Sequence, residues 1–274
     1  MSDAANNEER IFIFQGDSYD TPEDNRRCLM DRLLLGSRLY FYWHNINIFR
    51  KTGNAGKKGV LTGKLQTELS SCNIRLVERC GGKVHLRGLE HLRAMNGKPA
   101  VIIANHMSLL ETAVMHGFLR PYMDFTFVIK PALMKTPFLG NIMRALDAIV
   151  VSRDNPRQDL KTVMEEGKKR LDAGRSVVIF PQGTRSVEFD PAKFNSIGIK
   201  LAKSAGYPVI PLALKTDFLQ NGKYLRDLGP VKRDEDVWFE FGPAREITGN
   251  GREDLQEIVD FIAARLNTWN SLKG

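Results

Sequence analysis

The sequence predicts an α/β protein with a mixed, largely parallel sheet of about seven strands covered by helices, preceded by an N-terminal amphipathic helical hairpin. From Gly81 onward, short apolar runs alternate with segments of helical periodicity, which is typical of strands joined by covering helices. Before Gly81, apolar residues recur at helical spacing on both sides of a glycine-rich break. With 274 residues, 42% of them apolar, the chain is long enough to bury a core.

The elements are expected in a regular order along the chain. In the hairpin, Gly53, Gly56 and Gly59 with Lys57 and Lys58 are expected to separate the two helices. The second helix carries Leu61, Leu65, Leu69, Cys72 and Leu76. The predicted strands cover residues 83–87, 100–104, 125–129, 147–151, 176–180, 208–214 and 237–241, and the helices between and after them cover 109–118, 138–145, 160–171, 195–205 and 255–269.

Charge is distributed unevenly along the chain. Residues 1–24 hold seven acids and one arginine, and we expect an acidic, mostly mobile tail with one docking point at Ile11–Phe14. The remaining 250 residues therefore carry a net charge of +14, against +8 for the whole chain. Residues 25–64 contain nine Lys and Arg but only one acid, Asp31.

The basic segment also contains leucines, tyrosines, Phe41 and Trp43, which is typical of a helix lying on an anionic membrane, where each cation contributes about 1 kcal/mol. Arg38 and His44 interrupt the only long apolar stretch, and the acidic start lacks the apolar core of a signal peptide, so we expect a peripheral protein on the cytoplasmic face of a membrane. We predict a membrane-directed helical region over residues 25–78. The alternative is an ordinary amphipathic helix that docks on its own domain.

Several other classes are disfavoured. Cys28, Cys72 and Cys80 are odd in number and lack metal-ligand spacing, as do the histidines other than His106, so neither a disulfide framework nor a metal site is predicted. The sequence has no G-x-S-x-G elbow, phosphate-binding P-loop or dinucleotide fingerprint. Nucleic-acid binding is also disfavoured, because no groove-reading motif accompanies the basic charge.

The most informative stretch follows the apolar run Val101–Ala104. His106 comes directly after this predicted strand, in the turn where open α/β sheets bind ligands, and Glu111 lies five positions later. A carboxylate on one ring nitrogen would fix the tautomer of a histidine acting as general base. The competing interpretation is a capping box, with Ser108 as N-cap and Glu111 reaching back to its N–H.

A second loop follows the predicted strand at residues 176–180. Gly183 permits close approach of a ligand to the backbone, Thr184 and Ser186 offer hydroxyls, and Arg185 offers a planar donor fork suited to phosphate. The alternative is an ordinary turn whose arginine pairs with a surface carboxylate.

Together these segments resemble the glycerolipid acyltransferase family, whose best-known members are 1-acylglycerol-3-phosphate acyltransferases. His106 falls on the histidine of the family's N-H-x4-D block, Arg153 on the arginine of the second block, and Phe180–Ser186 on F-P-E-G-T-R-S. Val209–Ala213 falls on the fourth, apolar-proline block, so the resemblance covers about residues 80–220.

The resemblance implies an acyltransferase α/β domain over residues 79–274 that moves a fatty acyl group from acyl-CoA or acyl-carrier protein to the hydroxyl of a lysophospholipid in phospholipid biosynthesis, without a further cofactor. It implies that His106 is the general base, that Glu111 orients it, and that Arg185 and Arg153 hold the acceptor phosphate. Gln182, Gly183, Thr184 and Ser186 complete the predicted substrate-binding set.

Two residues depart from the family pattern. Glu111 stands where the family has aspartate, and its extra methylene suits a capping role as well as an orienting one. Gln182 stands where glutamate is usual, which removes a negative charge beside Arg185. Two alternatives therefore stay open: transfer to another acceptor, such as a lyso-ornithine lipid, and a non-catalytic, lipid-binding relative at the membrane surface.

Overall fold

The computed structural model describes residues 11–152 and 154–272, and its centre is an eight-stranded sheet in the order β1-β2-β8-β7-β3-β6-β4-β5. The predicted α/β class, with a mixed and mostly parallel sheet, is confirmed. Seven strands fall in the predicted segments; the additional strand is β1 at the sheet edge. The strands are β1 (Tyr19–Asp20), β2 (Val84–Arg87), β3 (Val101–Ala104), β4 (Phe125–Ile129), β5 (Ile149–Val150), β6 (Ser176–Ile179), β7 (Val209–Lys215) and β8 (Val237–Phe241).

Five neighbouring strands, from β7 through β3, β6 and β4 to β5, run parallel. Strand β8 is antiparallel to β7 and parallel to β2, and β1 pairs antiparallel with β2. Strands β3, β6 and β7 are buried along their whole length, which explains their uninterrupted apolar sequences. Because they are parallel neighbours, their carboxyl ends meet at one edge of the sheet.

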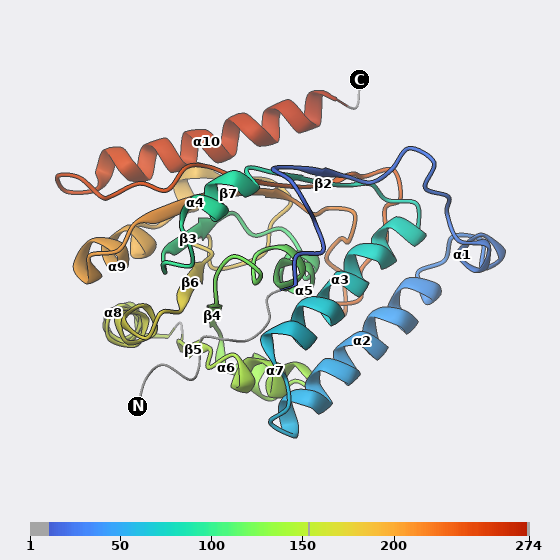
Figure 1. The fold of residues 1–274 in the computed structure, drawn as a ribbon, viewed down its shortest axis with the longest axis horizontal. Coiled ribbons are helices and arrows are strands. Elements are labelled where there is room, and N and C mark those ends of the chain that lie inside the picture. The colour runs from blue at the N-terminus through green and yellow to red at the C-terminus, as the bar shows by residue number, and fades with distance from the viewer. Residues whose placement is uncertain (1–10, 153, 273–274) are drawn as a thin grey trace.

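Helices cover both faces of this sheet (Figure 1). On one face, α9 packs on β3 and β7, α8 packs on α9, and α10 packs on β7. On the other face α5 lies beneath α3, and α2 packs on α3 and α7. The helices are α1 (Leu29–Leu33), α2 (Leu39–Lys57), α3 (Gly63–Arg79), α4 (Leu89–Ala94), α5 (Leu110–Phe118), α6 (Pro131–Met134), α7 (Leu139–Ala145), α8 (Pro156–Asp172), α9 (Ile197–Ala205) and α10 (Arg252–Ser271).

The hairpin of α2 and α3 exists, but its break lies later than predicted. Helix α2 continues through Gly53 and Gly56 and ends at Lys57, before Gly59 with a φ of +70°. A Cβ on Gly53 would lie 2.6 Å from the Phe138 carbonyl oxygen, and one on Gly56 would lie 2.9 Å from the Asn141 oxygen. These two glycines therefore serve close packing of α2 on α7, and the prediction that they end the helix was wrong.

The N-terminal segment is joined to distant parts of the chain. Residues 1–10 of the predicted tail lie outside the described residues, whereas the expected docking point includes the buried Phe14, whose ring packs 4.6 Å from that of Tyr19 in β1. Asp31 in α1 is fully buried, and its Oδ1 accepts a 2.7 Å hydrogen bond from Nη2 of Arg233. Arg27 pairs with the same carboxylate. The start of the helical hairpin is thus tied to the segment before β8.

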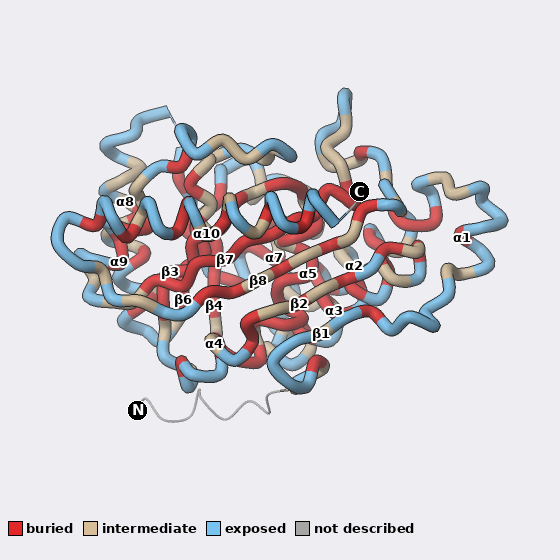
Figure 2. Tube along the Cα trace, turned by 90° about the horizontal axis from the view of Figure 1, so that it is seen from above, coloured by how far each residue is buried: buried red, intermediate tan, exposed pale blue. Residues whose placement is uncertain are grey.

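Helix α2 has an inward apolar face, and α1 and α2 both carry outward apolar side chains. Phe41 and Tyr42 are buried, which agrees with docking on the chain's own domain. Figure 2 shows α1 projecting at one end of the molecule, largely exposed. We call the exposed apolar side chains of this region the α1–α2 apolar face: Leu29, Met30, Leu33, Leu34, Leu35, Leu39, Trp43 and Ile46. Across residues 11–152 and 154–272, every helix is too short or too polar to cross a bilayer.

Candidate active site

Loops after β3, β6 and β7 meet at the carboxyl edge of the parallel sheet. The register places Ile103 of β3 opposite Ile179 of β6, and Ala104 opposite Leu212 of β7. The predicted loops, which start at residues 105 and 181, therefore begin side by side although 76 positions separate them. The edge is the site that parallel α/β sheets use for ligands.

Backbone contacts hold His106 in place. The preceding residue, Asn105, exchanges two hydrogen bonds with the backbone of Leu214, at 2.7 and 2.9 Å. The N–H of His106 donates to Oε1 of Gln182 at 2.8 Å, and its carbonyl accepts from the N–H of Ser186 at 2.8 Å. Its ring stacks on Phe180 with centroids 4.3 Å apart. Both ends of the second loop are thus fastened to the histidine.

Glu111 contacts the imidazole and the helix terminus at the same time. Its Oε1 lies 2.6 Å from Nδ1 of His106 and accepts a hydrogen bond from the N–H of Met107 at 2.8 Å. The N–H of Ser108 donates to both carboxylate oxygens, at 3.1 and 3.0 Å. Helix α5 begins at Leu110, with Leu109 as its N-cap, so Ser108, the predicted N-cap, lies one residue before the observed cap. Glu111 therefore both orients the imidazole of His106 and caps the start of α5, because its carboxylate has two oxygens.

The environment keeps Glu111 ionised. The side chain is completely buried, which by itself would raise its pKa, but the hydrogen bond and charge of His106 and the hydroxyl of Thr216 lower the pKa below its ordinary value. An ionised carboxylate only accepts hydrogen bonds, so Nδ1 of His106 carries the proton that it shares with Glu111. Nε2 is then the ring nitrogen with a free lone pair, as a general base requires.

The second predicted loop holds Arg185 with one end of its guanidinium paired. Its Nη2 lies 2.6 Å from Oδ1 of Asp227, whereas Nη1 is buried without a hydrogen-bond partner among the described residues. Gly183 adopts a φ of +70°, and a Cβ there would meet no atom within 4 Å. The Ser186 hydroxyl donates to the carbonyl of Glu188, and Thr184 is exposed. The loop thus offers one unsatisfied buried guanidinium nitrogen.

The remaining predicted residues separate into two cases. Arg153 lies outside the described residues, so its predicted role at the phosphate stays a prediction. Gln182 accepts from the backbone of His106, a structural contact that sequence reasoning did not foresee. Sequence reasoning also missed Thr216 and Asp227. Thr216 directly follows β7 at the carboxyl edge, so the rule that drew attention to His106 could have found it; Asp227 lies in an irregular segment without a local signal.

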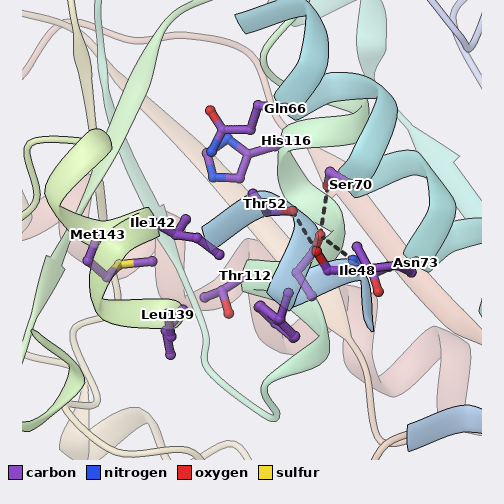
Figure 3. Close-up of a pocket in the computed structure, with 12 residues that line it drawn as sticks. Ile48, Thr52, Gln66, Ser70, Asn73, Thr112, His116, Leu139, Ile142 and Met143 are labelled. Atoms are coloured by element: carbon purple, nitrogen blue, oxygen red, sulfur yellow. Dashed lines mark hydrogen bonds between the residues drawn. The ribbon is translucent and has the colours of Figure 1, made fainter. Parts of the chain in front are cut away.

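A cavity lies behind the site, between α2, α3, α5 and α7 (Figure 3). Its cavity volume is about 30 Å³, within about 410 Å³ of space that includes open solvent. Burial lowers the pKa of His116 well below its usual value, so this ring is neutral. Thr112 and Ala113, which follow Glu111 in α5, are among its lining residues. The other lining residues are Ile48, Phe49, Thr52, Gln66, Ser70, Asn73, His116, Leu139, Ile142 and Met143.

Fold and site together define a class: α/β proteins with a histidine–carboxylate pair at the carboxyl ends of parallel strands and an arginine loop beside it. Residues 83–215, which include β3, β6, β7 and the loops after β3 and β6, match the model of the family described as Acyltransferase. This segment of the chain belongs to the acyltransferase family.

Individual relatives agree with this membership. The chain is 33% identical over 178 residues to the 1-acyl-sn-glycerol-3-phosphate acyltransferase of Pseudomonas aeruginosa, with 65% of each chain covered. It is 32% identical over 135 residues to a chloroplastic 1-acyl-sn-glycerol-3-phosphate acyltransferase of Arabidopsis thaliana, covering 48% of this chain and 36% of that one. The match thus spans less than two thirds of the length of these relatives.

A solved structure shares the fold. The crystal structure of the 1-acyl-sn-glycerophosphate acyltransferase PlsC from Thermotoga maritima superimposes with a TM-score of 0.66, over 89% of this chain and 97% of that one. The sequences are 21% identical. The likeness therefore supports the architecture.

Proposed function

We propose that this protein transfers a fatty acyl group from a thioester to the free hydroxyl of 1-acyl-sn-glycerol-3-phosphate. The observation that carries the proposal is the pair formed by Nδ1 of His106 and the buried Glu111, 2.6 Å apart and joined to the arginine loop through the backbone of His106. The names of the relatives from Pseudomonas and Arabidopsis support this acceptor.

The reaction needs no covalent enzyme intermediate. Nε2 of His106 takes the proton of the acceptor hydroxyl while the oxygen attacks the thioester carbonyl carbon. The C–O bond forms, the C–S bond breaks, and the leaving thiolate takes the proton back from the imidazolium. Glu111 stabilises the imidazolium that exists between these two proton transfers, and general base catalysis of this kind contributes roughly 10²–10⁴ in rate.

The arginine loop suits the acceptor phosphate. A guanidinium binds phosphate oxygens through parallel N–H donors, and Arg185 has a buried Nη1 that makes no other hydrogen bond among the described residues. Asp227 holds Nη2 of the same group at 2.6 Å, so the fork is positioned before the ligand binds. Arg153 is proposed as a second phosphate contact.

The acceptor is a membrane lipid, and the α1–α2 apolar face is the surface that we propose to contact the bilayer. Leu39, Trp43 and Ile46 share one exposed face of α2, and the surrounding segment is strongly basic, which favours anionic lipid. In this proposal residues 25–78 form the membrane-directed region of a peripheral protein on the cytoplasmic face, and residues 79–274 form the catalytic domain.

The test measures thiol release from acyl-CoA and, separately, from acyl-carrier protein. Purified protein is mixed with each donor, lysophosphatidate and anionic vesicles, and wild type is compared with His106→Ala. We expect release that depends on the acceptor and is lost in the variant. Equal release by both proteins would refute the proposal. Vesicle binding without release from any donor and acceptor, lyso-ornithine lipid included, would indicate a non-catalytic lipid-binding protein.

A further inference from the structure

One oxygen of Glu111 has no contact with His106. Its Oε2 lies 2.5 Å from Oγ1 of Thr216 and 3.1 Å from Oγ of Ser108, and both side chains are buried. The proposed acyl transfer uses only Oε1, which contacts the imidazole. The hydroxyl pair on the other side of the carboxylate therefore requires its own explanation.

The hydrogen bonds of this cluster form a chain that ends at the carboxylate of Glu111. The N–H of Leu110 donates to Oγ of Ser108 at 3.0 Å, and the Ser108 hydroxyl lies 2.9 Å from Oγ1 of Thr216. Thr216 has a single hydroxyl proton, which it donates to Glu111 at the short distance of 2.5 Å. A hydrogen bond to an ionised acceptor is stronger than a neutral one, so this contact fixes where Oε2 lies.

Thr216 itself is held rigidly. It follows the last residue of β7, and its two neighbours in sequence are joined by a 2.6 Å ion pair between Nζ of Lys215 and Oδ1 of Asp217. Lys215 also pairs at 2.6 Å with Glu235, and all these residues are buried. A hydroxyl held in this way can fix the position of a neighbouring side chain through a hydrogen bond.

We infer that Thr216 is a positioning residue for the histidine–glutamate pair and that Ser108 orients its hydroxyl. Thr216 anchors Oε2 so that Oε1 stays directed at Nδ1 of His106. The glutamate at position 111 suits this arrangement, since its extra methylene lets one carboxylate reach both the imidazole and the end of β7. The inference rests on the proposed acyl transfer, but the effect of Thr216 on the contact between Glu111 and His106 can be tested without turnover.

The first experiment compares Thr216→Val, which removes the hydroxyl at nearly constant shape, with Thr216→Ser, which keeps it. Thr126→Val is the matched control, because Thr126 is also a buried threonine but its hydroxyl has no partner among the described residues. We expect Thr216→Val to lower kcat about tenfold at unchanged KM for lysophosphatidate, and the other two variants to keep wild-type kcat. Wild-type kcat in Thr216→Val would overturn the inference.

A double-mutant cycle tests whether Thr216 acts through Glu111. In a Glu111→Ala background, Thr216→Val should lower kcat less than twofold further, because the side chain that it positions is already gone. A further tenfold loss in that background would overturn the inference, since Thr216 would then act by another route.

A spectroscopic measurement separates this inference from the proposed function. The proton on Nδ1 of His106 should give a downfield NMR resonance, assigned by its loss in His106→Ala. We expect the resonance in wild type and Thr216→Ser, and its broadening or loss through exchange in Thr216→Val. An unchanged resonance in Thr216→Val overturns the positioning role. If the resonance broadens or disappears in Thr216→Val but the wild-type protein releases no thiol, the acyl transfer is refuted and the positioning contact is supported.

Discussion

Replacing Glu111 by glutamine tests the charge of the buried pair with little change of shape. All side-chain and backbone groups that contact the carboxylate are donors: His106, Met107 and Ser108 at Oε1, and Ser108 and Thr216 at Oε2. The glutamine carbonyl can replace Oε1. Its amide then faces Thr216, whose hydroxyl can rotate to accept. The variant should therefore fold and keep the ring of His106 oriented.

The expected loss follows from the missing charge. An imidazolium and a carboxylate with charge centres about 4 Å apart attract each other by about 4 kcal/mol at the effective dielectric constant of such sites. Part of this energy is recovered by the neutral hydrogen bond, so we expect a fall in kcat of about 10²–10³.

The assay is thiol release from acyl-CoA at saturating lysophosphatidate, measured across the pH range for wild type and Glu111→Gln, with thermal melting as a control for folding. A kcat within twofold of wild type would contradict the reasoning and leave Glu111 as a helix cap only.

Four further predictions concern other parts of the molecule. Asp31→Asn should lower the free energy of unfolding by about 3–5 kcal/mol in urea denaturation, because it leaves Arg233 without its buried partner. Burial would raise the pKa of Asp31, but hydrogen bonds from Arg233 and Arg27 lower this pKa below the ordinary value of 3.8. The stabilisation from Asp31 is therefore present above pH 3.8 and is lost as the pH falls through the lower pKa of the folded state. A variant as stable as wild type at neutral pH would contradict this. Arg185→Ala should raise the KM for lysophosphatidate at least tenfold but leave that for monoacylglycerol, which lacks the phosphate, within twofold; equal effects on both acceptors would exclude a phosphate contact. Trp43→Glu with Leu39→Glu should abolish sedimentation with anionic vesicles, whereas Val60→Glu, at an exposed position beyond the other end of α2, should not; retained binding of the double variant would exclude the α1–α2 apolar face as the membrane contact. Ala113→Met adds a larger side chain at a buried position that lines the cavity and should lower the free energy of unfolding by about 1–3 kcal/mol; unchanged stability would contradict close packing at this position.

Local sequence was sufficient for most of the fold. Strands β3, β6 and β7 could be predicted because they are buried on both faces and read as uninterrupted apolar runs. Strand β1 could not, because it has two residues and depends on its pairing with β2. The continuation of α2 through Gly53 could not be predicted from local sequence either, since it depends on the close approach of Phe138, the N-cap of α7.

The candidate site divides in the same way. His106 and Glu111 are five positions apart, so their contact could be anticipated from spacing. Their wider network could not, because Thr216 lies 105 residues after Glu111, and Asp227 lies 42 residues after Arg185. Spacing also posed orientation and capping as alternatives, whereas a two-oxygen carboxylate in three dimensions makes both contacts.

The ion pair between Asp31 and Arg233 sets an order for the assembly of the protein during synthesis. It joins residues 202 positions apart, and the ribosome makes the chain from the N-terminus at roughly 5–20 residues per second. The segment that carries Asp31 therefore leaves the ribosome at least about ten seconds before this buried aspartate can meet its partner. During that interval a nascent chain has the proposed membrane-contacting helices but lacks β8, so in this proposal association with a bilayer can precede completion of the sheet.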